Sequence, residues 1–232
     1  MNVQTRITDR HGGVSAAPYG TRNLGAGSGD DLEAVAANRA RTAAEFGLDR
    51  VVFMRQVHSA DVRYVSEPFG DDPPPLDGIF TDVPGLGLAA LGADCACVLL
   101  ADPRAGLVGA AHSGRVGTVL GVVPALVAAM VAHGAGPADM TALIGPMACG
   151  TCYEVPAEMR DEVAAVLPEA WSITRQDTPA LDLRAAITSQ LAKAGVGEVT
   201  HDTRCTMETP DLFSHRRDRT TGRFAGYIWL ED

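Results

Sequence analysis

The segment LGLAALGADCACVLLADPRAGLVGAAHS, residues 86–113, is almost continuously apolar and is interrupted only by short polar turns. Three strands are predicted in it, at residues 86–91, 95–101 and 107–111. Apolar runs of this length, bounded by Gly, Asp and Pro, are typical of strands covered on both faces. The gaps between them are too short for helical crossovers, so the sheet is expected to contain antiparallel pairs. This segment therefore predicts the buried centre of a mixed sheet.

Helices and strands alternate on both sides of this segment. A helix is predicted over residues 32–46, because apolar residues recur there at helical spacing, Asp30 or Asp31 can cap its start, and Gly47 can end it. The other predicted elements are helices at 118–133, 156–167 and 183–194, strands at 51–54, 62–65, 141–144 and 224–230, and loops at 1–29 and 67–78. Pro124 is expected in a first turn or at a kink. Since no linker divides the chain, one α/β domain is predicted over residues 1–232.

Composition excludes several classes of partner. The 232 residues carry a formal net charge of −10, whereas a nucleic-acid-binding protein favours a basic face and an anionic membrane attracts basic segments. No apolar run approaches the roughly 20 residues that span a bilayer. The N-terminus also lacks the apolar core of a signal peptide. We expect a cytoplasmic protein that acts on small molecules, binds no nucleic acid and has no membrane association.

Histidine and cysteine interrupt three apolar segments at or near predicted strand ends, where sites on α/β scaffolds tend to form. A lone buried His or Cys is usually a packing residue. Together, however, His58, Cys95 and His112 suit one zinc ion with a coordination position left open for substrate or water. Cys97 is a competing thiolate, because residues two apart in a strand share a face. Asp94 could hold a ligand imidazole or simply form a turn.

Two other motifs are less specific. Cys149-Gly150-Thr151-Cys152 has redox-motif spacing but does not open a helix after a strand, and a single such pair is a weak indication of metal. With five cysteines, four of them in close pairs, a disulfide framework is not expected. Residues 211–219 are locally basic, as in a salt-bridged surface loop or an anion-binding edge of an active site.

Along nearly its whole length the chain resembles the bacterial laccase-domain proteins, also called multicopper polyphenol oxidases. The matching motifs are Gly12-Gly13-Val14-Ser15, Pro18-Tyr19, Asn23-Leu24-Gly25, Gly29-Asp30-Asp31, Gln56-Val57-His58, Ala93-Asp94-Cys95, Ala111-His112-x-Gly114, Ile144-Gly145-Pro146, Cys152-Tyr153-Glu154-Val155, Asp182-Leu183-Arg184, Arg204-Cys205-Thr206 and Phe213-Ser214-His215-Arg216-Arg217-Asp218. So many ordered motifs make the resemblance specific.

The resemblance implies a layered α/β sandwich with two mixed sheets. It also implies a zinc-dependent purine nucleoside phosphorylase for inosine, adenosine and methylthioadenosine, with adenosine deaminase activity. His58, Cys95 and His112 would then be the Zn²⁺ ligands and the catalytic centre. Four residues are expected to contact nucleoside or phosphate: Asn23, Arg55, Arg115 and Arg216.

The chain departs from the family pattern at two places. Gly27 stands where the family usually has a histidine, and Arg115-Val116 stands where it commonly has Trp-Arg. On a helix, a shift of one position turns a side chain by about 100°. Both departures predict a reshaped substrate pocket.

Three other functions are weighed against the phosphorylase. The first is a hydrolase that edits cell-wall precursors, with Cys95 as nucleophile. The second is a zinc-binding protein without catalysis. The third, polyphenol oxidation, is disfavoured, because a multicopper centre needs more imidazoles than six histidines without a His-x-His pair supply. Copper could also bind in vitro.

Overall fold

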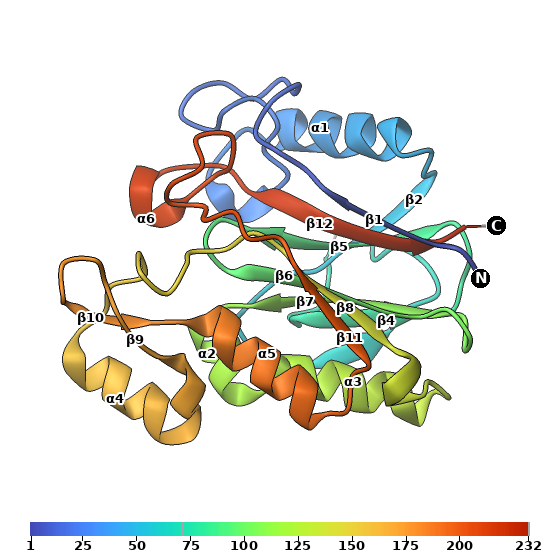
Figure 1. The fold of residues 1–232 in the computed structure, drawn as a ribbon. Helices are drawn as coiled ribbons and strands as arrows, with labels where there is room; N and C mark the ends of the chain where they lie inside the picture. Colours follow the sequence, from blue (N-terminus) through green and yellow to red (C-terminus); the bar gives the residue numbers. More distant parts are fainter. Residues whose placement is uncertain (71, 232) are drawn as a thin grey trace.

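Two β-sheets packed face to face lie between layers of helices in the computed structural model, which describes residues 1–70 and 72–231 (Figure 1). The four-stranded sheet has the order β1 (Val3–Ile7), β12 (Phe224–Leu230), β5 (Leu86–Gly92) and β2 (Arg50–Phe53). The six-stranded sheet has the order β11 (Glu198–His201), β8 (Thr141–Ile144), β6 (Ala96–Asp102), β7 (Leu107–Ser113), β4 (Gly78–Thr81) and β3 (Val62–Tyr64). Each sheet combines parallel and antiparallel pairs, so the predicted sandwich with two mixed sheets is confirmed.

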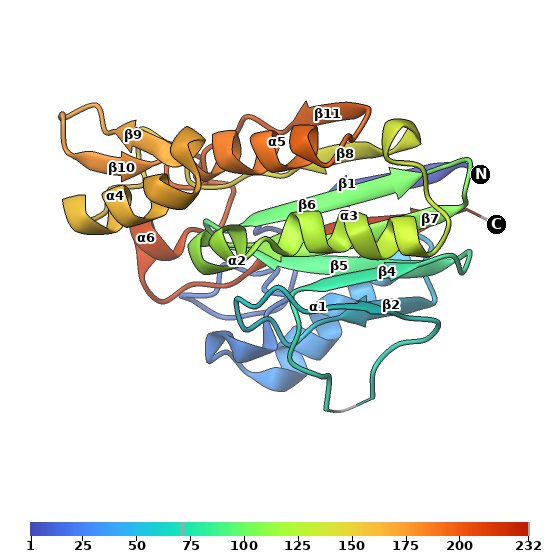
Figure 2. The same cartoon turned by 90° about the horizontal axis from the view of Figure 1, so that it is seen from below.

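One helix covers the outer face of the four-stranded sheet (Figure 1), and several cover the outer face of the six-stranded sheet (Figure 2). The helices are α1 (Leu32–Glu45) on the four-stranded sheet, α2 (Arg115–Leu120), α3 (Val122–Ala132) and α5 (Leu183–Lys193) on the six-stranded sheet, α4 (Ala157–Val166) on the hairpin of β9 (Trp171–Ile173) and β10 (Pro179–Leu181), and the short α6 (His215–Asp218). The start of α1 is fixed by Asp31, whose side chain accepts a hydrogen bond from the backbone N–H of Glu33.

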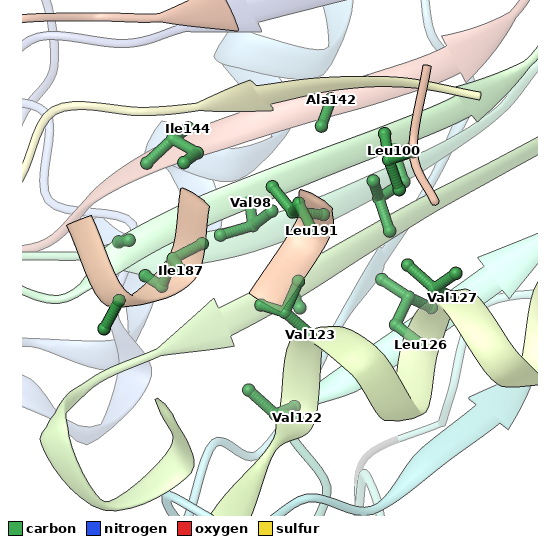
Figure 3. Packing of buried hydrophobic residues seen from close by; sticks show 14 of the residues in the cluster. Val98, Leu100, Val122, Val123, Leu126, Val127, Ala142, Ile144, Ile187 and Leu191 are labelled. Atoms are coloured by element: carbon green, nitrogen blue, oxygen red, sulfur yellow. The ribbon is translucent and has the colours of Figure 1, made fainter. Parts of the chain in front are cut away.

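The central strand β6 contributes to two hydrophobic layers, because successive side chains of a strand point to opposite faces. Val98 and Leu100 face the helices and pack in the cluster that contains Leu126 and Ile187 (Figure 3). Cys97 and Leu99 face the other way, into the layer between the two sheets. All seven residues of β6 are buried, which explains why its sequence is apolar without alternation.

Several elements differ from the sequence prediction. The predicted helix over residues 118–133 is two helices, because Gly121 adopts a left-handed conformation (φ = 83°) between them and Pro124 falls in the first turn of α3. Residues 1–29, predicted to be rich in loops, also contain a strand that was not predicted, since β1 pairs with β12 near the other end of the chain. The short strands β4, β9, β10 and β11 were also not predicted. Among the described residues, no helix is long and apolar enough to cross a membrane.

A buried carboxylate fixes the turn between β6 and β7. Asp102 is 1% exposed, and its side chain accepts hydrogen bonds from the backbone N–H groups of Arg104 (2.9 Å), Ala105 (2.9 Å) and Gly136 (2.8 Å). Burial alone would raise the pKa of Asp102, but these backbone donors outweigh burial and lower it below its usual value.

We predict that Asp102→Asn lowers the free energy of unfolding by about 1–3 kcal/mol at pH 7, because the amide cannot accept all three bonds. A depressed folded-state pKa stabilises the fold above the unfolded-state value of about 4, and this stability is lost as the pH falls through the folded-state value. The difference between variant and wild type in urea unfolding should therefore shrink toward pH 3. The control is Asp139→Asn, which removes an exposed ion pair with Arg104 and should cost at most about 1 kcal/mol.

Candidate functional site

Strand pairing brings the three predicted metal ligands to one end of the sandwich. β2 runs parallel to β5, and the register that pairs Cys97 with His112 sets the start of β6 beside the end of β7. His58 follows β2, Cys95 precedes β6 and His112 lies near the end of β7. One ligand atom from each of these three residues lies within 4.8 Å of the others.

The structure separates the two competing thiols. β6 begins at Ala96 rather than Cys95, and Asp94 has a left-handed conformation (φ = 100°), so the two cysteines do not share a face. Cys97 is fully buried between the sheets, where its Sγ donates to the backbone oxygen of Ala90 at 3.0 Å. Burial raises the pKa of the Cys97 thiol to about 12. Cys95 alone of the pair lies beside the histidines.

Asp77 holds both histidine-bearing segments. Its fully buried carboxylate pairs with Nδ1 of His112 at 2.8 Å and accepts hydrogen bonds from the backbone N–H groups of Val57 (3.1 Å) and Ser59 (2.6 Å). Burial would raise the pKa of Asp77, but His112 and these backbone donors outweigh it and lower the pKa to about 2. Nδ1 of His112 is thereby occupied, which leaves Nε2 for a ligand. Asp77 was not singled out from the sequence, because it stands at the end of a predicted loop that contains other carboxylates.

Asp94 forms a turn and does not hold an imidazole. Its carboxylate accepts hydrogen bonds from Oγ1 of Thr206 at 2.6 Å and from the backbone N–H of Arg216 at 2.7 Å. These contacts join the turn before Cys95 to the C-terminal part of the chain. Of the two roles considered for Asp94, the structure shows the turn.

The charges of the cluster favour an ionised thiol. Burial alone would raise the pKa of Cys95, but the charge of His112 and hydrogen bonds from His112 and His58 outweigh burial and lower that pKa. The pKa of His112 is raised above its usual value, since Cys95 and Asp77 outweigh the opposite effect of burial. A thiolate is the form of cysteine that binds metal.

The cluster has the dimensions of a tetrahedral metal site. Nε2 of His58 lies 3.9 Å from Sγ of Cys95, whereas bonds of about 2.0–2.3 Å to zinc place tetrahedral ligand atoms about 3.3–3.8 Å apart. Close approach depends on Gly114, because a Cβ there would lie 2.6 Å from Sγ of Cys95 and 2.9 Å from Cδ2 of His58. Two imidazoles and one thiolate suit Zn²⁺, and copper also accepts this donor set.

Two cavities adjoin the cluster. The larger, of about 680 Å³, is lined by His58, Cys95 and His112 together with the turn Gly25–Ser28, Arg39, Phe53, Met54, Arg55, Gln56, Pro73, Leu91, Gly92, Ala93, His215 and Arg223. The smaller, of about 310 Å³, is lined by Ala93, Asp94, Cys95, Arg115, Ala148, Tyr153, Leu183, His215 and Arg216. Because Cys95 lines both, a metal bound there would stand between two compartments.

The four predicted substrate contacts occupy different places. Arg55 lines the larger cavity, whereas Arg115 and Arg216 line the smaller one. The guanidinium of Arg216 donates to the backbone oxygen of Glu154 at 2.9 Å, but that of Arg115 has no protein partner in the described part of the chain. Asn23 is fully buried, and its side chain bonds Ser28, Asp30 and the backbone of Gly25 and Arg223. Asn23 therefore holds the turn Gly25–Ser28, which lines the larger cavity, and does not itself line either cavity.

His215 was not singled out from the sequence, although it belongs to the basic segment at residues 211–219. Its ring lines both cavities. Nδ1 lies 2.8 Å from the backbone oxygen of Arg219, and because a carbonyl only accepts, Nδ1 carries the proton. Nε2 is then free to exchange a proton with a bound molecule. The same segment is also structural, since Arg217 donates to the backbone oxygens of Thr206 and Leu212.

Both departures from the family pattern border the cavities. Gly27 lines the larger cavity, and a Cβ there would meet nothing within 4 Å, so this side of the cavity is open. Arg115 begins α2 and still lines the smaller cavity despite its shift by one position. The shift therefore keeps a cation at the site, while the neighbouring Val116 is 39% exposed.

Comparisons with known proteins show relatives along nearly the whole chain. The family described as multi-copper polyphenol oxidoreductase laccase matches residues 4–231. A Streptomyces griseus protein named purine nucleoside phosphorylase ORF3 is 57% identical over 97% of this chain and 93% of its own length. A Mycobacterium tuberculosis protein also named purine nucleoside phosphorylase is 50% identical over 99% of this chain and 94% of its own. The crystal structure of YlmD from Geobacillus stearothermophilus has a TM-score of 0.91 and 35% identity, and the match covers 99% of this chain and 92% of that one. The chain therefore belongs to the multi-copper polyphenol oxidoreductase laccase family, as its motifs indicated.

Proposed function

We propose that this protein is a zinc-dependent purine nucleoside phosphorylase of the cytoplasm that also deaminates adenosine. The observation that carries the proposal is that two cavities meet at the cluster of His58, Cys95 and His112, called here the His₂Cys cluster. The smaller cavity also holds an arginine, Arg115, that has no protein partner in the described part of the chain. A phosphorylase needs two such compartments, because it brings a nucleoside and an anion together. The names of the relatives support the same reaction.

The larger cavity suits the nucleoside. Its wall combines apolar and aromatic side chains, among them Phe53 and Met54, with the polar turn Gly25–Ser28. The guanidinium of Arg39 lies 3.9 Å from the ring centroid of Phe53 and donates to the backbone oxygen of Leu24, so this wall is rigid. A purine is flat and apolar on its faces and polar at its edges, which such a lining matches.

The smaller cavity suits phosphate. Arg115 can offer its guanidinium to phosphate oxygens in the paired geometry that favours arginine for this anion. Both oxygens of the nearby Asp94 carboxylate are already engaged, one by the hydroxyl of Thr206 and the other by the backbone N–H of Arg216. Cys95 lines this cavity too, so phosphate held by Arg115 would face the end of the larger cavity.

In phosphorolysis, a phosphate oxygen forms a bond to the anomeric carbon of the ribose as the bond from that carbon to the purine nitrogen breaks. The electron pair of the broken bond moves to the purine, which must gain a proton. His215 lines both compartments and, as an imidazolium with Nδ1–H held by the backbone oxygen of Arg219, is the group placed to deliver that proton from Nε2. Zinc, when bound by His58, Cys95 and His112, would supply a Lewis acid. In deamination, water instead adds to C6 of the purine and ammonia leaves from that carbon, while the bond between purine and ribose is kept.

The first prediction from this proposal concerns the metal. His58→Ala and Cys95→Ser should each remove one equivalent of zinc per chain, measured by elemental analysis, and abolish phosphorolysis and deamination together. Their folding should be preserved, because neither residue supports Asp77. His112→Ala should also lose the metal but cost about 1–3 kcal/mol of stability, since it leaves the buried Asp77 carboxylate without its partner.

Cys97→Ser is the matched control for Cys95→Ser, because a serine hydroxyl can still donate to Ala90. It should keep the metal and both activities. Loss of the same equivalent of zinc in Cys97→Ser would contradict the ligand assignment. An amide-cleaving activity that persists in metal-free protein would instead favour a Cys95 nucleophile and the cell-wall hydrolase. Tight zinc binding without any turnover of nucleosides would favour a non-catalytic protein.

The second prediction concerns phosphate. Arg115→Gln should raise KM for phosphate about 10–100-fold, because a bond between charged groups contributes about 1.5–3 kcal/mol. Adenosine deamination should change little, since water is its co-substrate. Arg55→Gln removes the same charge from the other cavity and should leave KM for phosphate nearly unchanged. If Arg55→Gln raises KM for phosphate and Arg115→Gln does not, phosphate binds in the larger cavity and the assignment of the two cavities is reversed.

The third prediction concerns proton delivery. His215→Gln should lower kcat for inosine phosphorolysis about 10²–10⁴-fold, because general acid catalysis contributes by that amount. KM for phosphate and the zinc content should stay close to those of wild type. Steady-state kinetics with 7-methylguanosine, whose cationic purine leaves without protonation, should show a much smaller loss. An equal loss with both nucleosides would rule out His215 as the acid.

A further inference from the structure

A second group of metal-binding side chains lies apart from the His₂Cys cluster. It contains Cys149, Cys152, Cys205 and Glu208, and one ligand atom from each lies within 4.8 Å of the others. All of these cysteines are free thiols. The first two follow β8 and the other two follow β11, the strand that pairs with β8 in parallel. The grouping of these four residues was not predicted from the sequence, because 52 residues separate Cys152 from Cys205 in the chain.

The backbone around these side chains is arranged as in a compact metal site. The Cys149–Cys152 turn is closed by hydrogen bonds from the N–H groups of Cys152 (2.9 Å) and Tyr153 (3.0 Å) to the backbone oxygen of Cys149. The N–H of Cys149 donates to Sγ of Cys205 at 3.4 Å. Amide donors of this kind stabilise thiolates that bind a metal. A bridge between Met147 and Cys205 holds the two turns in register.

Two arginines lie beside the group and can offset its negative charge. Nη1 of Arg175 donates to Sγ of Cys152 at 3.7 Å and also pairs with the carboxylate of Glu208. Nη1 of Arg184 donates to the backbone oxygen of Asp202 at 2.6 Å, three residues before Cys205, and its buried Nη2 has no hydrogen-bond partner among the described residues. Three thiolates and a carboxylate around a divalent ion leave a net charge of −2, so two neighbouring guanidinium groups suit a loaded site.

We propose that Cys149, Cys152, Cys205 and Glu208 form a second metal site that binds one Zn²⁺ and serves structure. Four protein ligands close the coordination sphere, which distinguishes structural zinc sites from catalytic ones. Tetrahedral bonds of about 2.3 Å to sulfur place thiolates about 3.8 Å apart, so the ligands need to move inward by no more than about 1 Å. This site is independent of the proposed phosphorylase activity.

The bound ion would stabilise one wall of the smaller cavity. Ala148 precedes the Cys149–Cys152 turn and Tyr153 follows it, and both line that cavity. Thr206, next to Cys205, donates to the carboxylate of Asp94 beside Cys95. A metal shared by these two turns would therefore fix the wall against which Arg216 stacks, with its guanidinium 4.7 Å from the ring centroid of Tyr153.

Metal content tests the proposal without any measurement of activity. Protein purified without chelators should contain two zinc ions per chain. The double variant Cys149→Ser/Cys152→Ser should contain one, and so should His58→Ala, whereas the control Cys97→Ser should retain two. Circular dichroism should confirm that each variant is folded. Cys205→Ser provides a second variant if the double variant does not fold.

X-ray absorption distinguishes which ion remains. In His58→Ala the residual zinc should have a shell dominated by sulfur at about 2.3 Å, and in Cys149→Ser/Cys152→Ser it should have mostly nitrogen at about 2.0 Å. One zinc in wild type that disappears with His58→Ala would overturn the second site and leave the first intact. A disulfide between two of these cysteines in protein purified under reducing conditions, detected by mass spectrometry, would also overturn it.

Discussion

The buried carboxylate of Asp77 is the contact on which the candidate active site depends. One oxygen pairs with Nδ1 of His112, and the other accepts the backbone N–H groups on either side of His58. His58 has a left-handed backbone (φ = 63°), which costs energy in a residue with a side chain, and the two bonds to Asp77 hold it there. Two of the three proposed metal ligands thus take their positions from one group that does not line either cavity. Removal of one partner from such a buried pair lowers the free energy of unfolding by more than the intact pair contributes to it, because the other partner is left buried without its opposite charge.

The local charge of the site differs from that of the whole molecule. The chain carries a net charge of −10, yet five arginines line the two cavities: Arg39, Arg55, Arg115, Arg216 and Arg223. Protein contacts already engage Arg39, Arg55, Arg216 and Arg223, which keeps those guanidinium groups in place. An anion is therefore repelled by the surface at long range and attracted only near the cavities. At physiological salt the long-range term is screened within about 8 Å, so the local charges decide binding.

The sequence predicted the central strands and the three clustered ligands, because both depend on local patterns. Buried strands require apolar runs, and His58, Cys95 and His112 stood out as polar interruptions of such runs. Asp77 was missed because carboxylates are common in its proline-rich loop, and only the pairing of β4 with β7 sets it beside His112. Cys205 was missed as a partner of Cys149 and Cys152 for the same reason, since the parallel pairing of β8 with β11 joins them. The choice between Cys95 and Cys97 depended on where β6 begins, which a left-handed Asp94 decides.

The position of β12 has a consequence for the order in which the protein is assembled on the ribosome. β12 is made after β1, β2 and β5, yet it lies between β1 and β5 in the four-stranded sheet, and all seven of its residues are buried. Until it emerges, β1 has no neighbour in that sheet, and one long edge of β5 stays unpaired. The layer between the two sheets is also incomplete, because Phe224, Ile228 and Leu230 belong to it. Open strand edges and exposed apolar faces pair with other chains, so aggregation is most favourable in the period before β12 emerges. Chaperone binding should matter most in that period.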